Sequence, residues 1–291
     1  MTRPVMITGA AGQLGFELQR TAPEGTPLIA VDIERLDITS AAAVDAFIAE
    51  HQPAVIINGA AYTAVDKAEE EQAIAEAVNV TAARSLSEAA ARHGARLIQV
   101  STDFVFGGAS ILPWTPRDVT APESVYGRTK RDGEQAVLSI LGNNALVVRT
   151  AWLYSAHGGN FVKTMLRLMN ERDEVRVIAD QIGTPTWANS LARTIWMAVA
   201  QADVSGVLPW TDAGVASWYD FAVAIQEEAL VRGLLTRAVP VHAISTAAYP
   251  TRAKRPSFSV LDKGDTVSAL GVTPSHWRGN LRLMLDELAN A

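Results

Sequence analysis

The stretch "ITGAAGQLGFEL" at residues 7–18 places Gly9, Gly12 and Gly15 three residues apart, directly after an apolar run and at the start of a helical pattern. In this setting the first glycine allows a tight turn, and the second lets the backbone approach a pyrophosphate. The third lets the helix pack closely against the preceding strand. A glycine triplet alone also occurs in plain strand-to-helix turns, so a second signal is needed.

That second signal is Asp32, which ends the next apolar run. A carboxylate about 20 residues beyond the turn can accept hydrogen bonds from an adenosine ribose. An acid here favours NADH because it repels a 2′-phosphate, whereas Arg20 and Arg35 keep NADPH open as an alternative. The residues that we predict to bind this dinucleotide are Gly9, Gly12, Gln13, Leu14, Gly15, Asp32, Asp37, Ile38, Ala60, Ala61, Tyr62, Tyr126 and Lys130.

Apolar runs of strand length alternate with amphipathic segments through the first half of the chain. The expected strands are 4–8, 27–32, 54–60, 96–102 and 145–152, and the expected helices are 13–21, 39–51, 69–93 and 126–141. Strands that alternate with helices in this way form parallel sheets covered on both faces. The pattern therefore predicts an α/β fold, a doubly wound parallel sheet of Rossmann type. Within helix 69–93 one buried stripe is expected, formed by Ile74, Val78, Ala82 and Leu86.

After about residue 152 the rhythm becomes irregular and prolines interrupt it. Helices are expected at 160–171, 189–201, 216–232 and 277–289, and strands at 174–180, 239–244 and 257–261. We expect these elements to form a smaller C-terminal lobe that is interwoven with the sheet. The predicted division is a dinucleotide-binding domain at 1–152, to which 174–201 returns, and a mainly substrate-binding lobe at 153–291.

Composition excludes several classes of protein. The formal charge of −6 argues against a nucleic-acid-binding face, because binding the phosphate backbone requires clustered Lys and Arg. With no cysteine, disulfides and thiolate metal sites are excluded. No apolar run approaches the ~18 residues of a membrane span, and the N-terminus lacks the pattern of a signal peptide. We therefore expect a cytoplasmic protein that binds neither nucleic acid nor membrane.

The segment "SVYGRTKRDGE" at 124–134 places Tyr126 and Lys130 four residues apart, on one face of an expected helix. Because a lysine cation stabilises a phenolate, we expect Lys130 to lower the pKa of Tyr126 and to tune it for proton exchange with a carbonyl. Thr102, at the end of an expected strand, would add a hydrogen bond to the same oxygen. Such a pair alone is more often a solvated lysine beside a half-buried ring. The order of glycine turn, Asp32, Thr102, Tyr126 and Lys130 favours catalysis, because all of these belong at one end of the sheet.

Further motifs occur together between residue 6 and about residue 262: "TGAAGQLG", "AAYTAVDKAE", "STDFVF", "VYGRTK", "VVRTAWLY", "DQIGTPT" and "RPSFSVLD". In combination they resemble the extended short-chain dehydrogenase/reductase family. Within it the chain is similar to enzymes that use NADPH or NADH to reduce a dTDP-linked 4-keto-6-deoxy sugar. That sugar nucleotide is dTDP-4-dehydro-6-deoxy-L-mannose, and its reduction gives dTDP-L-rhamnose for the cell envelope.

The resemblance also implies roles for individual residues. Thr102, Tyr126 and Lys130 would form the catalytic triad, with Lys130 also holding the nicotinamide ribose. The residues implied to bind substrate are Val65, Thr102, Asp103, Phe104, Tyr126, Trp152 and Arg255. From the residues themselves, Arg255 would suit a pyrophosphate and Trp152 would offer a flat wall to a sugar or a base. A surface charge and a domain-interface aromatic are the alternative interpretations of these two residues.

Some positions depart from the family pattern. Phe104 and Gly107 replace a tyrosine and an aspartate that are common there, so hydrogen bonds from those two side chains are lost. Some members bind Mg²⁺ at a dimer interface through acids that follow the "DQ-G-PT" motif, but here no carboxylate occurs between Thr186 and Asp203. We therefore predict no bound metal, and a homodimer is left open.

Three alternative functions also stay open. A nucleotide-sugar 4-epimerase of the same fold uses the same tyrosine and lysine but does not release its NAD. A 4,6-dehydratase needs an Asp-Glu pair after the fourth strand, whereas this chain has Asp103 followed by Phe104. A non-catalytic dinucleotide-binding regulatory subunit would keep the fold, although such proteins commonly lose the tyrosine or the lysine.

Overall fold

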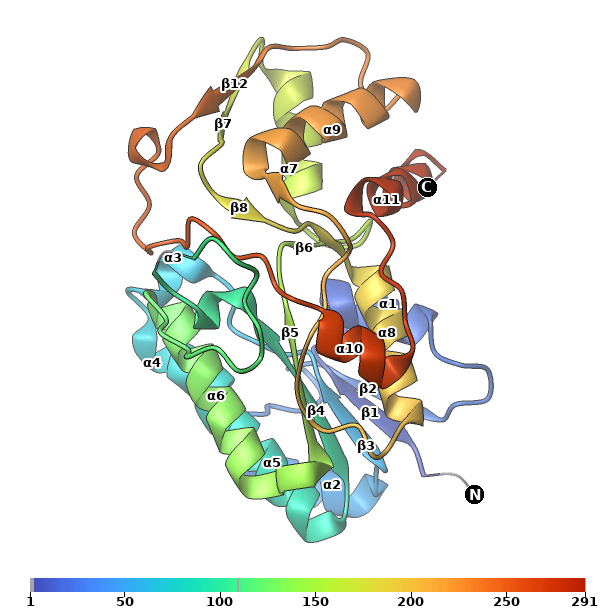
Figure 1. Cartoon of the computed structure of the whole chain (residues 1–291). Coiled ribbons are helices and arrows are strands. Elements are labelled where there is room, and N and C mark those ends of the chain that lie inside the picture. The colour runs from blue at the N-terminus through green and yellow to red at the C-terminus, as the bar shows by residue number, and fades with distance from the viewer. Residues whose placement is uncertain (1–2, 109, 291) are drawn as a thin grey trace.

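A six-stranded parallel sheet forms the centre of the computed structural model, which describes residues 3–108 and 110–290 (Figure 1). The strand order is β10-β5-β4-β3-β1-β2, and the winding reverses between β1 and β3. The strands are β1 Val5–Thr8, β2 Leu28–Val31, β3 Val55–Asn58, β4 Arg96–Thr102, β5 Ala145–Thr150 and β10 Gly206–Pro209. The predicted Rossmann-type α/β fold is confirmed.

Helices cover both faces of this sheet, because its strands are apolar on both sides. In β1, Val5 and Ile7 pack toward one layer of helices while Met6 packs toward the other. The first layer contains α1 Gln13–Arg20, α8 Ala188–Ala200 and α10 Gly264–Leu270, and the second contains α2 Ala41–His51, α5 Ala82–His93 and α6 Val125–Leu141.

The expected helix 69–93 is interrupted. The chain forms α3 Val65–Ala68, α4 Gln72–Glu76, a π-helical turn at Ala77–Thr81 and then α5. A π-turn inserts one extra residue into a helix, which rotates the side chains that precede it. Ile74 is therefore 51% exposed instead of buried, and Ala75 and Asn79 take the inward positions. Of the predicted buried stripe, only Ala82 and Leu86 are buried.

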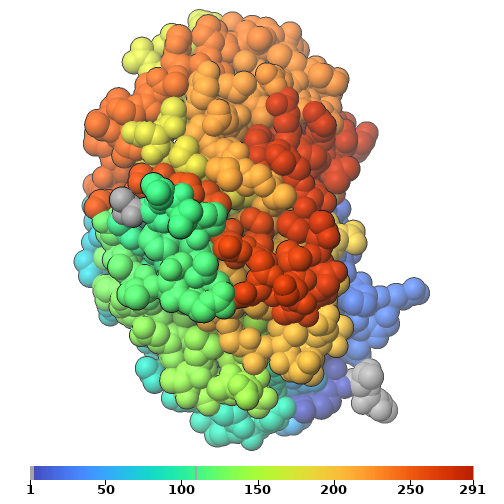
Figure 2. Space-filling view, in the orientation of Figure 1, coloured from blue at the N-terminus to red at the C-terminus, as the bar shows by residue number. Residues whose placement is uncertain are grey.

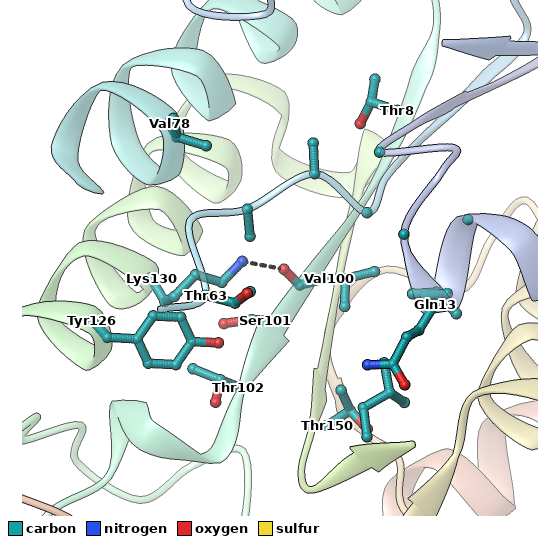
Figure 3. Close-up of a pocket in the computed structure, with 18 of the residues that line it drawn as sticks. Thr8, Gln13, Thr63, Val78, Val100, Ser101, Thr102, Tyr126, Lys130 and Thr150 are labelled. Carbon is teal, nitrogen blue, oxygen red and sulfur yellow. Dashed lines mark hydrogen bonds between the residues drawn. The ribbon is translucent and has the colours of Figure 1, made fainter. Parts of the chain in front are cut away.

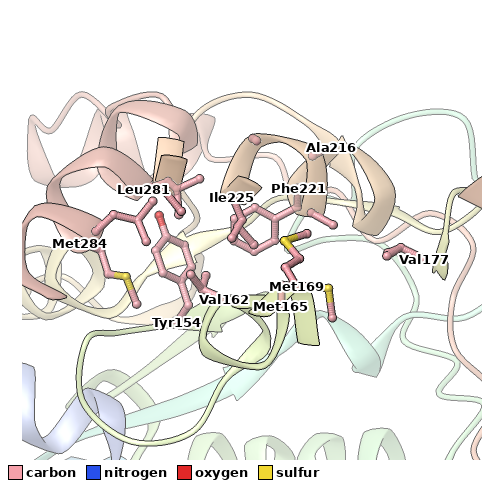
Figure 4. Close-up of a cluster of buried hydrophobic side chains, with 14 of the residues drawn as sticks. Tyr154, Val162, Met165, Met169, Val177, Ala216, Phe221, Ile225, Leu281 and Met284 are labelled. Carbon is pink, nitrogen blue, oxygen red and sulfur yellow. The ribbon is translucent and has the colours of Figure 1, made fainter. Parts of the chain in front are cut away.

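A smaller lobe lies beyond the carboxyl ends of the strands (Figure 1). Its elements are β6 Leu153–Tyr154, α7 Phe161–Glu171, β7 Val175–Ile178, β8 Ile182–Gly183, β9 Thr186–Trp187, β11 Ala216–Ser217, α9 Trp218–Val231, β12 Val241–Ile244 and α11 Trp277–Ala289. Tyr154, Phe221 and Met284 come from different elements and pack in one apolar cluster (Figure 4). The lobe thus has a hydrophobic core of its own.

The two parts are interwoven, and their boundary differs from the predicted one in two places. Strand β7, within the segment 174–201 that was expected to return to the sheet, pairs with β12 in the lobe. Strand β10 and helix α10 were not predicted, yet β10 pairs with β5 and completes the sheet. Its sequence "GVLP" is short and ends in Pro209, which an edge strand tolerates because one side of it needs no partner.

We therefore propose a revised division of the chain. The dinucleotide-binding part consists of the chain up to residue 152 together with α8, β10 and α10, and the remaining elements form the lobe. Residues 1, 2, 109 and 291 of the predicted ranges lie outside the described residues.

The segment 257–261, predicted as a strand, makes only isolated bridges. Leu261 pairs with Trp114 and Phe258 pairs with Ile182. Figure 2 shows the red-orange surface of this C-terminal stretch lying against the green surface that surrounds Trp114 in the sequence. These bridges join the lobe to the loop that follows β4 and so close one side of the space between the two parts.

Candidate active site

A cavity of about 860 Å³ lies at the carboxyl ends of the strands, where the lobe meets the sheet. Ligands of open α/β sheets bind at this edge, beside the point where the winding reverses. The predicted residues that line it are Gly9, Gly12, Gln13, Leu14, Gly15, Asp32, Asp37, Ile38, Ala60, Ala61, Val65, Thr102, Asp103, Phe104, Tyr126, Lys130, Trp152 and Arg255. Residues far apart in the sequence are thus brought to one site.

The glycine turn is packed so closely that side chains are excluded from it. Gly9 has a φ of +66°, and a Cβ there would lie 2.8 Å from Ala60 N. A Cβ on Gly15 would lie 2.1 Å from Gly9 O. This bare backbone leads into α1 and makes a surface that a pyrophosphate can approach. The turn therefore fits the dinucleotide that its sequence predicts.

Two carboxylates line the cavity beside the glycine turn. Asp32 Oδ2 accepts from Ala11 N at 2.8 Å, and its Oδ1 accepts from Ile33 N at 2.9 Å. Asp37, at the same end, accepts from Thr39 N and Oγ1, and these bonds hold the pKa of Asp37 below its usual value. Both carboxylates are thus fixed by local donors, and the lowered pKa of Asp37 keeps that group ionised at neutral pH.

The two arginines that kept NADPH open make contacts outside the cavity lining. Arg20 is paired with Glu17 and Glu287 near the end of α1. Arg35 donates to Ala30 O and stacks its guanidinium over the Phe47 ring. Neither arginine lines the cavity, whereas Asp32 and Asp37 do.

Helix α6 delivers the proposed catalytic pair (Figure 3). The helix begins after Ser124, whose Oγ accepts from Gly127 N at 3.1 Å. A Cβ on Gly127 would lie 2.2 Å from Phe104 O, so this glycine lets the first turn of the helix approach the end of β4. Lys130 Nζ donates to Val100 O at 2.7 Å. Figure 3 shows Tyr126, Thr102 and Lys130 in one region of the cavity, with the Lys130 ammonium directed at Val100 O.

Burial shifts the pKa values of both residues, and for Tyr126 the direction is opposite to the one expected from the sequence. Burial raises the pKa of Tyr126 to about 12, against a smaller opposing effect of the Thr102 hydroxyl. Burial also lowers the pKa of Lys130 to about 8, while the charge of Glu134 acts in the opposite direction. The predicted lowering of the Tyr126 pKa is therefore wrong, because loss of solvation outweighs the opposing effect of Thr102. The phenol keeps its proton at neutral pH.

Asp103 is an acidic residue that lines the same cavity as Thr102 and Tyr126. It is only 2% exposed, and its Oδ1 accepts from Thr102 Oγ1 at 2.9 Å. Burial raises the pKa of Asp103 to about 6, with the hydrogen bonds from Ser259 and Thr102 opposing that shift. Its negative charge also raises the pKa of Tyr126. Asp103 is therefore coupled to the phenol through Thr102.

Trp152 stands at the junction of the sheet and the lobe with a φ of +48°, which is unusual for a bulky residue. One face of its ring stacks on Trp218, with centroids 3.6 Å apart and planes inclined by 7°. A Cβ on Gly183 would lie 2.5 to 2.7 Å from three adjacent ring atoms, which places Gly183 over the other face. Trp152 thus presents its edge to the cavity, and the expected flat wall is not available.

Tyr62 is the predicted cofactor residue that does not line the cavity. Its hydroxyl donates to Glu71, and its backbone N–H donates to Asn79 Oδ1 at 2.9 Å. Its ring packs in a small cluster with Val125 and Tyr126. The cavity instead meets Thr63, the next residue along the chain.

Several lining residues were missed in the sequence: Thr39, Thr63, Val78, Ser101, Thr150, Leu153 and Trp218. Thr150 could have been found, because β4 and β5 run in parallel and Thr150 pairs with Thr102 in the ladder. Trp218 carries no such signal. It directly follows the Ser217 cap of α9, and its stacking on Trp152 depends on how the lobe docks.

Neither a metal centre nor a membrane anchor is evident in the parts of the chain that the structure describes. Residues 3–108 and 110–290 contain no group of three or more His, Asp or Glu side chains placed to hold a metal ion. Within the same residues, no helix combines the length and the apolar character that crossing a bilayer requires.

A family model described as the RmlD substrate binding domain matches residues 2–290. The chain belongs to the RmlD family. A curated relative from Aggregatibacter actinomycetemcomitans, called dTDP-4-dehydrorhamnose reductase, is 41% identical over 285 residues, covering 96% of this chain and 97% of the relative. The predicted resemblance is thereby confirmed.

Two further relatives show how broad the similarity is. A Streptomyces antibioticus protein called probable dTDP-4,6-dihydroxy-2-methyloxan-3-one 4-ketoreductase is 43% identical over 291 residues, 98% of this chain and 96% of that protein. The crystal structure of dTDP-4-dehydrorhamnose reductase from Bacillus anthracis in complex with NADP is 36% identical, with a TM-score of 0.93. The match covers 99% of this chain and 100% of the Bacillus anthracis chain. As an RmlD family member the chain is an oxidoreductase, and its glycine turn is that of a nicotinamide-dinucleotide enzyme.

Proposed function

We propose that the protein reduces the 4-keto group of dTDP-4-dehydro-6-deoxy-L-mannose to give dTDP-L-rhamnose, with NADH or NADPH as the reductant. The observation that carries the proposal is one cavity in which the glycine turn lies at one end and Thr102, Tyr126 and Lys130 lie at the other. The printed names of the Aggregatibacter and Bacillus relatives support this choice of substrate.

Tyr126 is the proposed proton donor. The bound nicotinamide would supply hydride to the carbonyl carbon of the sugar. The phenol is protonated at neutral pH because its pKa is raised to about 12, so it can give a proton to the oxygen as charge develops there. Thr102, whose single hydroxyl proton is directed to Asp103 Oδ1 in the structure, would turn that proton to the same oxygen when substrate binds. Lys130, anchored on Val100 O, would stabilise the phenolate that remains.

The other end of the substrate is proposed to meet residues from both parts of the molecule. The buried carboxyl group of Asp103 can accept a hydrogen bond from a sugar hydroxyl, and the edge of Trp152 limits how far the sugar enters. Val65 and Arg255 line the cavity farther from the sheet, where Arg255 offers charge to a diphosphate. Phe104 contributes only apolar surface there.

NADH is the proposed preferred cofactor. The ribose end of the cavity is lined by Asp32 and Asp37, and the lining cations, Lys130 and Arg255, lie at other points of the cavity. A 2′-phosphate would face carboxylates without a partner, and juxtaposed like charges cost several kcal/mol. The Bacillus anthracis relative was crystallised with NADP, so both cofactors are compared in the test.

The test is oxidation of NADH and of NADPH in the presence of dTDP-, UDP- and GDP-linked 4-keto-6-deoxy-mannose. We expect stoichiometric oxidation with the dTDP sugar and a kcat/KM at least ~10-fold higher with NADH. No turnover with any of the three sugars would refute the proposed reaction. Equal kcat/KM values for the two cofactors would refute the NADH preference alone.

A second candidate is a ketoreductase for a different dTDP-linked 4-keto sugar, because the Streptomyces antibioticus relative with such a name is 43% identical. Products separated by chromatography would distinguish the two substrates. An epimerase is distinguished by its cofactor, since it would purify with NAD bound and would not consume free NADH.

Activity is expected to be independent of metal ions. Oxygen ligands of Mg²⁺ must converge, and the described residues offer no such cluster. Exhaustive treatment with EDTA followed by gel filtration should leave kcat unchanged. Loss of activity that added Mg²⁺ restores would contradict this prediction. A homodimer and a cytoplasmic location remain predictions from the sequence.

A further inference from the structure

The segment Arg252–Arg255 crosses from the lobe to the dinucleotide-binding part beside α3 (Figure 1). Each of its three cations pairs with an acid of that part. Arg252 pairs with Glu70, Lys254 pairs with Glu123, and Arg255 pairs with Asp66. We refer to Arg252–Arg255 as the basic crossing. Of its three cations, only Arg255 also lines the cavity.

Asp66 differs from the other two acids because it binds both the backbone and a side chain of the basic crossing. Its Oδ1 accepts from Ala253 N at 3.0 Å and from Arg255 Nη1 at 3.1 Å. Its Oδ2 accepts from Arg255 Nη2 at 2.7 Å. The hydrogen bonds from Arg255 hold the pKa of Asp66 below its usual value. The carboxylate is therefore ionised at neutral pH, and it holds one edge of the guanidinium through Nη1 and Nη2.

A guanidinium has two edges that can each bind an oxyanion through a pair of N–H groups. Asp66 occupies the edge formed by Nη1 and Nη2, and the second N–H of Nη1 is directed to Ala253 O at 3.3 Å. The edge formed by Nε and the other N–H of Nη2 donates no hydrogen bond to any described residue. That edge is the one left for a ligand in the cavity that Arg255 lines.

Charge in the cavity favours Arg255 as the residue for a diphosphate. The lining cations of the described chain are Lys130 and Arg255. Lys130 is 5% exposed and donates to Val100 O beside the proposed proton donor. Arg255, at the part of the cavity that Val65 also lines, is available to the nucleotide side of the substrate.

We propose that Asp66 is a positioning residue that presents the free edge of Arg255 to the diphosphate of the nucleotide-sugar, and this inference rests on the proposed function. An arginine on a crossing segment would otherwise lose side-chain freedom when it binds, and a fixed partner removes much of that cost in advance. Asp66 follows Val65 at the start of α3. One short helix thus supplies both a wall of the cavity and the anchor of its arginine.

The test compares binding of dTDP to the full chain and to its variants by titration calorimetry, with steady-state kinetics on the dTDP sugar. Asp66→Asn is expected to raise the Kd for dTDP and the KM for the sugar by roughly 10-fold or more, since one partner of a charge pair is lost. The KM for NADH and kcat at saturation should change by less than about 2-fold.

The matched control is Glu70→Gln, which removes a second ion pair of the same basic crossing without touching Arg255. If Asp66 served only to hold the basic crossing against the dinucleotide-binding part, both variants would weaken dTDP binding to the same extent. That result would overturn the proposal.

A double-mutant cycle gives an independent readout. Arg255→Lys removes the second edge of the side chain, so adding Asp66→Asn to it should cost little further affinity. Additive losses in the double variant would contradict a role through Arg255. If the unaltered protein binds dTDP and Asp66→Asn binds it equally well, only this inference fails. If the unaltered protein neither binds dTDP nor turns over the sugar, the proposed function fails with it.

Discussion

Tyr126→Phe is expected to lower kcat by on the order of 10²-fold or more, because the variant lacks the proposed proton donor to the carbonyl oxygen. The Kd for NADH should change little, since the phenol hydroxyl lies at the catalytic end and the glycine turn is untouched. Stopped-flow measurement of a single turnover separates this chemical step from product release.

Tyr62→Phe is the matched control for that variant. Tyr62 packs in the same small cluster as Tyr126, but its hydroxyl donates to Glu71 and does not line the cavity. Removing it should leave kcat within about 2-fold of the unaltered protein. Normal turnover by Tyr126→Phe would remove Tyr126 from the mechanism, and equal losses in the two variants would point to packing instead of proton transfer.

Gly15→Ala is expected to have the second large effect. The new Cβ would lie 2.1 Å from Gly9 O and 2.6 Å from Ala10 Cα, both of which are backbone atoms that a rotamer change cannot move. Relieving this overlap should lower the free energy of unfolding by about 3 kcal/mol. Because the turn itself must shift, affinity for NADH should fall on the order of 10²-fold. Urea denaturation and a fluorescence titration with NADH measure the two effects.

Gly12→Ala and Gly279→Ala are the controls for Gly15→Ala. A Cβ on Gly12 would lie 3.2 Å from Gly9 O. A shift of a few tenths of an ångström would relieve this contact, so the losses of stability and of NADH affinity should be smaller than for Gly15→Ala. A Cβ on Gly279 in α11 meets open space, and the change should stabilise the protein by ~0.4–1 kcal/mol. If Gly15→Ala bound NADH as tightly as Gly12→Ala does, close packing at Gly15 would not be what shapes the turn.

The parts of the fold that the sequence predicts are those determined by local pattern. The glycine turn and the first five strands are local features, because apolar runs flanked by amphipathic segments have few other ways to bury their side chains. Strand β10 escaped prediction because its four residues end in Pro209 and it forms only where β5 offers an edge. The π-helical turn escaped because one extra residue leaves no mark in composition, although it moves Ile74 to the surface.

The candidate site shows the same division between local and tertiary causes. Spacing along α6 predicts that Tyr126 and Lys130 share a face, but the direction of the Tyr126 pKa shift depends on burial by other elements. Chemistry alone suggests Arg255 as a partner for phosphate, yet its pairing with Asp66 requires the lobe to reach α3. The stacking of Trp218 on Trp152 depends likewise on docking.

The position of β10 also bears on how the chain can fold during synthesis. Strand β5 is complete at Thr150, but the strand that covers its outer edge is supplied only after the chain has passed through α7, β7 and α8. Until then the backbone N–H and C=O groups of β5 lie at an open sheet edge, which can pair with other chains. The nascent dinucleotide-binding part is thus incomplete until residue 209 has emerged, so both parts are expected to reach the native state late and together.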